Sequence, residues 1–279
     1  MKKIICLIIA SVGIIRISYA QNVSDKIALS KNQELVAVTT VNGLVSIEMM
    51  GQNMETISES AITRIIEVKD ITPSGYMLTG TTNKMKVKTK GGLAPAVEFD
   101  SDKKEDMNSE IGKSLADKFQ PKDMEITFAG KSVEKKDTAN EEDMATIMQS
   151  VISGNGDNDI AGLFMLLPPG KKQGDVWSDS SGNRGIKINN TYTLKQIIGN
   201  EATIAINTVS IINKTMQVQG AALTIIMNSK IYTNNIIDIT TGIIKEKKTT
   251  IDGAGNLSAG GMEMPMATKV TMVTTVKNL

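Results

Sequence analysis

Strand-length runs of isoleucine, threonine and asparagine dominate the chain from residue 185 to residue 251. Because β-branched side chains are restricted at their first torsion, they fit a pleated surface better than a helix wall. Gly199-Asn200 and Thr241-Gly242 predict two turns between these runs, and residues 266–277 predict a last strand with one buried face. The runs read IKINNTYTLKQII, ATIAINTVSII, ALTIIMNSKIY and IIDITTGIIKEKKTTI.

Two hairpins are predicted in the first half of the chain. The alternating stretches ELVAVTTV and LVSIEMM flank Asn42-Gly43, a dipeptide that tolerates positive φ and favours a tight turn. Residues 61–69 and 76–90 predict a second pair of strands around the turn Pro73-Ser74-Gly75. Near the end of this pair every second residue is a lysine, which places Lys84, Lys86, Lys88 and Lys90 on one face of a strand.

Helical periodicity is confined to the middle of the chain. Residues 102–119 carry apolar side chains four positions apart, which predicts a helix with one apolar stripe. A second helix is predicted over residues 140–152, because Asn140 is suited to cap it and three acidic residues follow. The apolar segment 160–167 comes next and is expected to pack against the sheet. The apolar face of the second helix would hold Met144, Ile147, Met148, Val151 and Ile152.

These patterns predict a mainly β protein with a helical insert, built on an antiparallel, curved sheet or half-barrel. One hypothesis divides it into two similar β-rich halves, 31–135 and 171–279, around the helical segment 140–167; similar composition alone is the alternative. Residues 243–251 carry lysines on both faces and are predicted to lie at an edge or in a protruding hairpin. Residues 221–227 are apolar on both faces and are predicted to be central and covered.

The start of the chain predicts export. Residues 1–20 have the form of a secretory signal peptide, with two lysines, an apolar run and small residues before Gln21. Arg16 interrupts the apolar run before the roughly 20 residues that a membrane-spanning helix needs. We therefore expect a single mature domain, 21–279, in the periplasm, on the outer surface or outside the cell. Loss of the signal would change the formal charge from +1 to −2 and remove the only cysteine, Cys6.

The composition excludes several kinds of chemistry. The mature chain would hold neither histidine nor cysteine, which supply most zinc ligands and the usual general base. Near-neutral charge and 3% aromatic residues argue against nucleic acid as a partner. No later apolar run is long enough to span a membrane, and no cofactor is predicted. No metal is predicted, because GNGDND lacks the glutamate that closes a calcium-binding EF-hand loop.

Binding is predicted instead, at an apolar pocket between the sheet and the helices. Methionine, of which there are 17, lines adaptable pockets and also fills gaps in cores. Trp177, the single tryptophan, is either a core anchor or a ligand contact. The pocket candidates are Met144, Ile147, Met148, Val151, Phe164 and Trp177. Lys84, Lys86 and Lys88 are candidates for contact with an anionic surface; a solvated face or a protected edge is the alternative.

Several short phrases carry a resemblance to a known family. MGQNME, VEFDSD, LLPPGKKQGDVWSD and IDITTGIIK resemble those of an uncharacterised family of secreted, mostly β proteins of Gram-negative bacteria. This resemblance implies an envelope or extracellular location and supplies no catalytic residue. More distantly, long strands with a helical insert resemble the half-barrel of periplasmic lipoprotein carriers, whose curved sheet encloses an apolar cavity. Fold analogy of this kind is a weak guide to function.

Three functions follow as expectations. The first is a non-catalytic exported protein that binds an apolar or lipid-like ligand in a cavity between curved sheet and helices. The alternative is a structural or protein-interaction module that joins an envelope protein. The third is a carboxylate-dependent hydrolase, because paired carboxylates need no local sequence signature.

Overall fold

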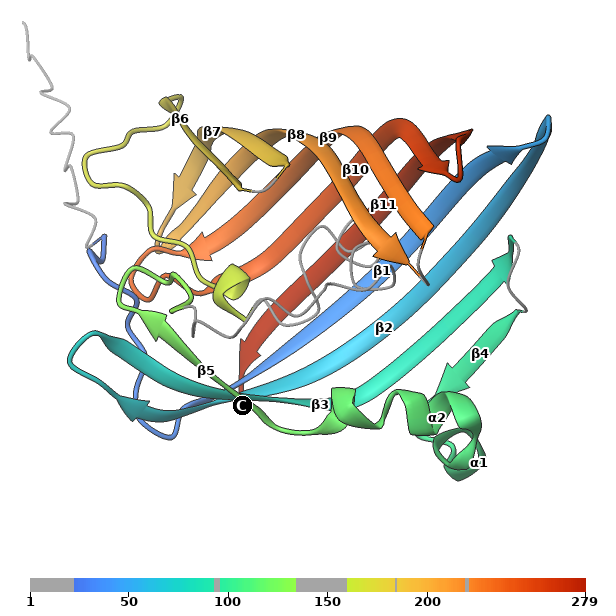
Figure 1. Cartoon of the computed structure of the whole chain (residues 1–279). Helices are drawn as coiled ribbons and strands as arrows, with labels where there is room; N and C mark the ends of the chain where they lie inside the picture. Colours follow the sequence, from blue (N-terminus) through green and yellow to red (C-terminus); the bar gives the residue numbers. More distant parts are fainter. Residues whose placement is uncertain (1–22, 93–95, 134–159, 184, 219–220) are drawn as a thin grey trace, which may run out of the picture.

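A computed structural model describes residues 23–92, 96–133, 160–183, 185–218 and 221–279. In these residues eleven strands form one antiparallel sheet that curves into an open trough (Figure 1). The strand order is β4-β3-β2-β1-β11-β10-β9-β8-β7-β6, and β5 pairs with another part of β3. This arrangement confirms the predicted antiparallel, curved sheet. The two halves of the chain share the sheet, because β1 pairs with β11.

The elements follow the chain from hairpin to hairpin. The strands are β1 Glu34–Met49, β2 Gln52–Ile71, β3 Gly75–Gly91, β4 Val97–Asp100, β5 Lys122–Thr127, β6 Val176–Asn183, β7 Ile186–Ile198, β8 Glu201–Val218, β9 Ala221–Asp238, β10 Ile244–Ala259 and β11 Met262–Asn278. The helices are α1 Lys104–Asn108 and α2 Glu110–Ser114, with single 3₁₀ turns η1 Ala116–Phe119 and η2 Ala161–Leu163.

Alternation along the strands gives the sheet one buried face. In β1, Leu35 and Ala37 are buried, whereas Val38, which points the other way, is 38% exposed. In β11 the buried side chains again come at every second position from Met266 to Val276. Because adjacent strands are in register, these positions line up across the sheet and form its concave face.

Core packing closes one end of the trough. The first buried cluster joins β1, β2 and β3 to β5 and to the segments around Ile27 and Phe164. The Tyr76 hydroxyl donates to the Ile27 carbonyl oxygen at 2.7 Å, which ties the first described segment to β3. A second cluster continues this end across β7–β10 and contains Leu167, Leu194, Ala202, Ile204, Ile237, Ile239 and Ile244.

The predicted turn Thr241-Gly242 lies under these closing segments. Its backbone accepts hydrogen bonds from the Ala28 and Met165 amides, at 2.9 and 2.8 Å. Gly242 has φ +74°, and a Cβ there would lie 2.4 Å from the Ile27 Cδ1 atom. The turn therefore needs glycine both for its backbone conformation and for the close packing of its neighbours. The predicted turns at Pro73-Ser74-Gly75 and Gly199-Asn200 are also confirmed.

The turn predicted at Asn42-Gly43 is wrong. Both residues lie inside β1, where Gly43 pairs with Ser58 on one side and Val270 on the other. The chain reverses at Met50-Gly51 instead, with φ of 53° and 75°. Two consecutive positive φ values are those of a type I′ turn, the usual two-residue hairpin loop. Strand pairing on both sides therefore overrides the local preference of an Asn-Gly dipeptide.

The helix predicted over residues 102–119 is broken into α1, α2 and η1. Ser109 separates the first two with an extended backbone (ψ 170°), and its hydroxyl accepts the Gly112 amide as the cap of α2. Phe119, at the end of the expected stripe, contacts Phe99 of β4 at 6.4 Å between ring centroids. The helix predicted over residues 140–152 lies outside the described residues.

The edge position predicted for residues 243–251 is wrong, because β10 lies between β9 and β11. Ion pairs accommodate two of its lysines: Lys245 with Glu201 at 2.9 Å, and Lys248 with Glu246 at 2.9 Å. A register shift after Ile244 also changes which face each side chain occupies.

Residues 221–227 are central as predicted, since β9 lies between β8 and β10. The prediction that both faces are covered is wrong. Leu223, Ile225 and Met227 are buried on the concave face, whereas Ile226 on the opposite face is 43% exposed.

The Met50-Gly51 turn gives the first prediction. Met50 is 84% exposed and adopts a left-handed conformation that asparagine tolerates better than methionine. Met50→Asn should therefore raise the free energy of unfolding, by up to about 1 kcal/mol. Urea denaturation measures the change. Met262→Asn, at an exposed strand position, is the matched control and should bring no gain; equal effects would contradict the turn assignment.

Candidate functional site

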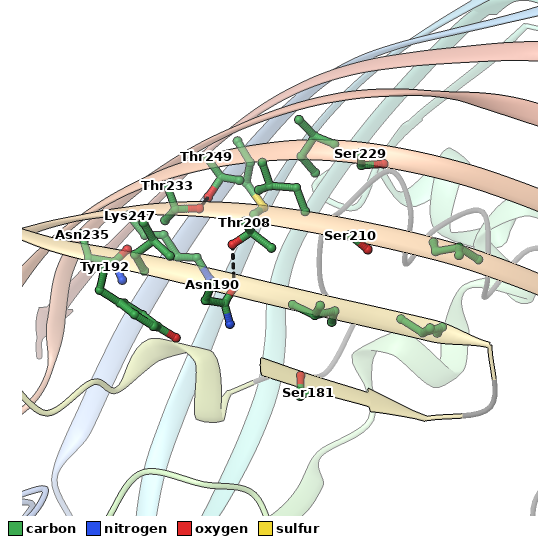
Figure 2. A pocket seen from close by; sticks show the side chains of 17 residues that line it. Ser181, Asn190, Tyr192, Thr208, Ser210, Ser229, Thr233, Asn235, Lys247 and Thr249 are labelled. Atoms are coloured by element: carbon green, nitrogen blue, oxygen red, sulfur yellow. Dashed lines mark hydrogen bonds between the residues drawn. The ribbon is translucent and has the colours of Figure 1, made fainter. Parts of the chain in front are cut away.

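A cavity of about 500 Å³ opens on the concave face of strands β6–β11 (Figure 2). Its volume is within the usual range for a small-molecule site, about 300–1,000 Å³. Among the described residues that line it, one side chain, Lys247, is charged. The lining consists of Ser181, Ile186, Ile188, Asn190, Tyr192, Ile206, Thr208, Ser210, Ile212, Ser229, Ile231, Thr233, Asn235, Lys247, Thr249, Ile251 and Met272.

Strand register brings these side chains together. Asn235 of β9 lies opposite Lys247 of β10 and Ile204 of β8. Two residues along β9, Thr233 lies opposite Thr249, and their hydroxyl groups are hydrogen-bonded at 3.1 Å. Each strand thus contributes every second residue to a continuous wall.

The concave face changes in polarity along the strands. Near the closed end the wall carries Asn235, Lys247 and the threonine pair. Toward the opposite end it passes into a buried apolar cluster of Ile225, Met227 and Met266, which is packed against Ile47, Ile212 and Leu257. The face is therefore polar at one end and apolar at the other.

The middle of the wall is lined by small side chains. Ser210, Ser229 and Gly253 lie side by side on β8, β9 and β10. A Cβ on Gly253 would lie 2.7 Å from the Ser229 Oγ atom and 2.8 Å from the Thr268 Cγ2 atom. Small residues at these positions leave space in the cavity, because a larger side chain here would project into it.

A chain of hydrogen bonds holds the edge strand β6 to the sheet. The Asp179 carboxylate accepts the Tyr192 hydroxyl at 2.9 Å and the Asn190 amide at 2.8 Å. The Asn190 carbonyl oxygen accepts the Thr208 hydroxyl at 2.6 Å, which is one of the dashed lines in Figure 2. Burial and the neighbouring Asp179 carboxylate raise the pKa of Tyr192 to about 12.

Trp177 continues this wall on β6. Its ring stacks on Tyr192 with centroids 5.4 Å apart and an angle of 5° between planes. The Lys171 ammonium lies 5.3 Å from the centroid of the indole ring, within cation–π range. The single tryptophan is therefore in contact with a residue that lines the cavity, so its fluorescence can report on occupancy.

Asn235 is the most unusual group in the cavity. It is 4% exposed, and its amide nitrogen donates to the Met165 Sδ atom at 3.5 Å. Its Oδ1 atom is buried and has no hydrogen-bond partner among the residues that the structure describes. A buried acceptor without a partner costs about 1–3 kcal/mol, so this oxygen is a place where a ligand donor would be stabilising.

The structure separates the pocket residues predicted from the sequence. Phe164 is 6% exposed and belongs to the core cluster at the closed end, whereas Trp177 lies beside the cavity wall. The other four candidates, Met144, Ile147, Met148 and Val151, lie outside the described residues. The residues that sequence reasoning missed are the polar side chains on otherwise apolar strand faces, above all Asn235 and Lys247.

The predicted lysine face is paired with acidic side chains. Lys84, Lys86 and Lys88 are on the outer face of β3, and they form ion pairs with Asp102 (3.1 Å), Asp100 (2.9 Å) and Glu98 (3.5 Å). The hydrogen bond with Asp100 raises the pKa of Lys86, and in turn it lowers the pKa of Asp100. The acidic groups of β4 and the following turn thus balance this row of positive charge.

Acidic side chains are absent from the described lining of the cavity. The two oxygens of nearby Asp179 already accept hydrogen bonds. Over the described ranges no cluster of three or more potential ligands could hold a metal ion. No helix in the described part of the chain is long and apolar enough to cross a membrane.

Comparison with known proteins identifies a structural relative. No protein-family model and no curated protein sequence matches the chain. The solved structure of lipovitellin is similar, with a TM-score of 0.51 and 13% identity over 90% of this chain. The chain spans 25% of the length of lipovitellin. At this identity the likeness shows a shared fold.

Two bacterial structures match more weakly. They are an outer membrane channel from Pseudomonas putida F1, at 8% identity and a TM-score of 0.23, and Pseudomonas aeruginosa OccK5, at 6% and 0.25. The matches cover 91% and 88% of this chain and 98% of each of those chains. These scores are too low to indicate a common fold.

The raised pKa of Tyr192 gives the second prediction. Because its folded pKa is about 12 and the ordinary value is 10.0, its contribution to stability is complete below pH 10 and is lost as pH rises toward 12. Tyr192→Phe should be less stable than the parent protein at pH 8, by up to about 1 kcal/mol. That difference should shrink as pH is raised above 10.

Denaturation at a series of pH values measures this loss. A tyrosinate absorbance titration, in which Tyr192→Phe should lack the component that titrates at about pH 12, is the independent check. Tyr232→Phe, at an exposed position of β9, is the control. A titration curve of Tyr192→Phe that keeps the parent's component at about pH 12 would contradict the hydrogen-bonded arrangement.

Proposed function

We propose that this protein is a non-catalytic, exported carrier that holds an apolar or lipid-like molecule on the concave face of its sheet. The observation that carries the proposal is the cavity on strands β6–β11, whose wall has Asn235, Lys247 and threonine hydroxyl groups near the closed end and isoleucine side chains farther along the strands. An amphiphile has the same division between a polar end and an apolar end. Burial of its chain against the isoleucines that line the cavity, among them Ile206, Ile231 and Ile251, would supply the affinity.

The fold supports this proposal. Lipovitellin, with which the chain shares its fold, is described in a study of lipid–protein interactions. In the described residues no second sheet packs against this strongly curved one, whose concave face therefore offers apolar surface to a small ligand. The signal-like start and the resemblance to secreted β proteins support an envelope or extracellular location, and membership of that family stays a prediction.

The interaction-module alternative has less support. The lysine row on β3 is charge-balanced by β4, so it does not offer a strongly positive surface to an envelope partner. Exposed apolar residues on the outer face either stand apart, as Val38 and Ile57 do, or form a small group on the paired strands β8 and β9, which consists of Val209, Ile211, Ile226 and Tyr232. Single exposed apolar residues and small apolar patches are both normal on monomeric proteins. A partner protein therefore stays a prediction without a defined surface.

Blocking the cavity tests the proposal. Ser210→Phe and Ser229→Phe each replace a small, buried side chain of the cavity wall by a large one. Each should weaken binding of cis-parinaric acid by about tenfold or more, which corresponds to about 1.4 kcal/mol. Energy transfer from Trp177 to the bound polyene measures the affinity. Lys230→Phe changes the opposite face of the same strand and should leave binding unchanged.

Two outcomes would support or contradict the proposed carrier function. Saturable binding that the blocking variants weaken, together with a bound small molecule in native mass spectra of the purified protein, supports the carrier function. Absence of saturable binding to the parent protein, with no copurified small molecule, would show that the proposal is wrong.

A further inference from the structure

Asn235 marks the place where a ligand's polar end would bind. The Met165 thioether accepts a hydrogen bond from its amide nitrogen, and the Met165 backbone is itself fixed by its hydrogen bond to Gly242 at 2.8 Å. The amide orientation is therefore set by a packed neighbour. Its Oδ1 atom remains without a partner although the side chain is 4% exposed and lines the cavity.

The chemistry of this oxygen restricts its partner. A carbonyl oxygen accepts hydrogen bonds and does not donate them, so its partner must carry an O–H or N–H group. A carboxylate or a simple ester cannot supply such a donor. The nearby hydroxyl groups of Thr233 and Thr249 are bonded to each other and do not satisfy it. A cationic donor would lie beside the charged Lys247, which is opposite Asn235 on β10, so the donor that fits this oxygen is a neutral hydroxyl or amide group.

The wall of β9 gives the direction for the rest of the ligand. Along its concave face the side chains follow in the order Asn235, Thr233, Ile231, Ser229, Met227 and Ile225. The distance from Asn235 to Met227 is roughly 26 Å, from a rise of about 3.3 Å per residue. The part of this row that lines the cavity, from Asn235 to Ser229, is about 20 Å long, which suits an extended acyl chain packed on Ile206, Ile231 and Ile251.

We infer that the cavity binds an amphiphile in a defined orientation, with a neutral hydrogen-bond donor of its head group on Asn235 and its acyl chain along β9. A fatty acid ester of a polyol is the class of lipid that has these groups. The inference rests on the proposed carrier function and adds the head-group class and the anchoring residue.

Competition experiments test the inference with ligands of one chain length. The measurement is the displacement of cis-parinaric acid by monoolein, oleate and methyl oleate. The proteins compared are the parent, Asn235→Leu and the control Asn234→Leu, whose substitution is on the opposite face of β9. The parent and the control should bind monoolein about tenfold more tightly than methyl oleate, the value of one hydrogen bond to a buried acceptor. In Asn235→Leu the two esters should bind equally, with affinity for methyl oleate retained.

A second pair of variants guards against misfolding of the leucine variant. Asn235→Ser and Asn235→Ala have nearly the same size and differ by one hydroxyl group. The serine variant should keep part of the preference for monoolein, and the alanine variant should lose it. Circular dichroism and thermal denaturation establish that each variant used is folded.

The outcomes separate the inference from the carrier function. If all three lipids bind and Asn235→Leu keeps the parent's preference for monoolein, the inference is wrong while the carrier function stands. Tighter binding of oleate than of monoolein in both proteins would also contradict it, since charge rather than a donor would then select the ligand. If no lipid binds the parent protein, the carrier function itself is wrong.

Discussion

The pairing of β1 with β11 is the constraint on which the rest of the structure depends. Residues 35–47 of β1 pair continuously with residues 266–278 of β11, so the first and last strands join two sets of hairpins into one sheet. Such a contact between distant parts of the chain forms late and at a high cost in loop entropy. It is stabilised by apolar side chains that line up across both strands, including Leu35, Ala37 and Val276.

A single sheet of this width must cover its apolar face, and the chain does so unequally. At the closed end the segments around Ile27, Phe164 and Leu167 pack against it and form an ordinary core. Farther along the strands, serine, threonine and asparagine replace part of the apolar surface on β7–β10. A face of this composition is too polar for a dry core and too apolar for free solvation. It is suited to an amphiphilic ligand, which has both polar and apolar parts.

The sequence predicted strands and most turns because both depend on nearby residues, as at Pro73-Ser74-Gly75 and Gly199-Asn200. It could not predict that β1 continues through Asn42-Gly43, since that outcome depends on partners at Ser58 and Val270. The residues that line the cavity could not be predicted from the sequence for the same reason. Register shifts between Leu194 and Gln196 and after Ile244 decide which side chains face inward, and the strand order decides which of them meet.

Asn235 and Thr268 show how burial alone differs from a binding site. Both side chains are buried on the concave face, and both have an oxygen without a partner. The methyl group of Thr268 packs over Gly253, where a Cβ would lie 2.8 Å from it, and Thr268 is not part of the cavity lining. Asn235 lines the cavity at the polar end of the wall and has its nitrogen fixed by Met165. A leucine there would lose the weak contact with Met165 but would remove the unsatisfied oxygen and extend the apolar surface of Ile204 on the next strand, so the described protein neighbours give no reason for the oxygen of the amide. Recognition of a ligand donor does.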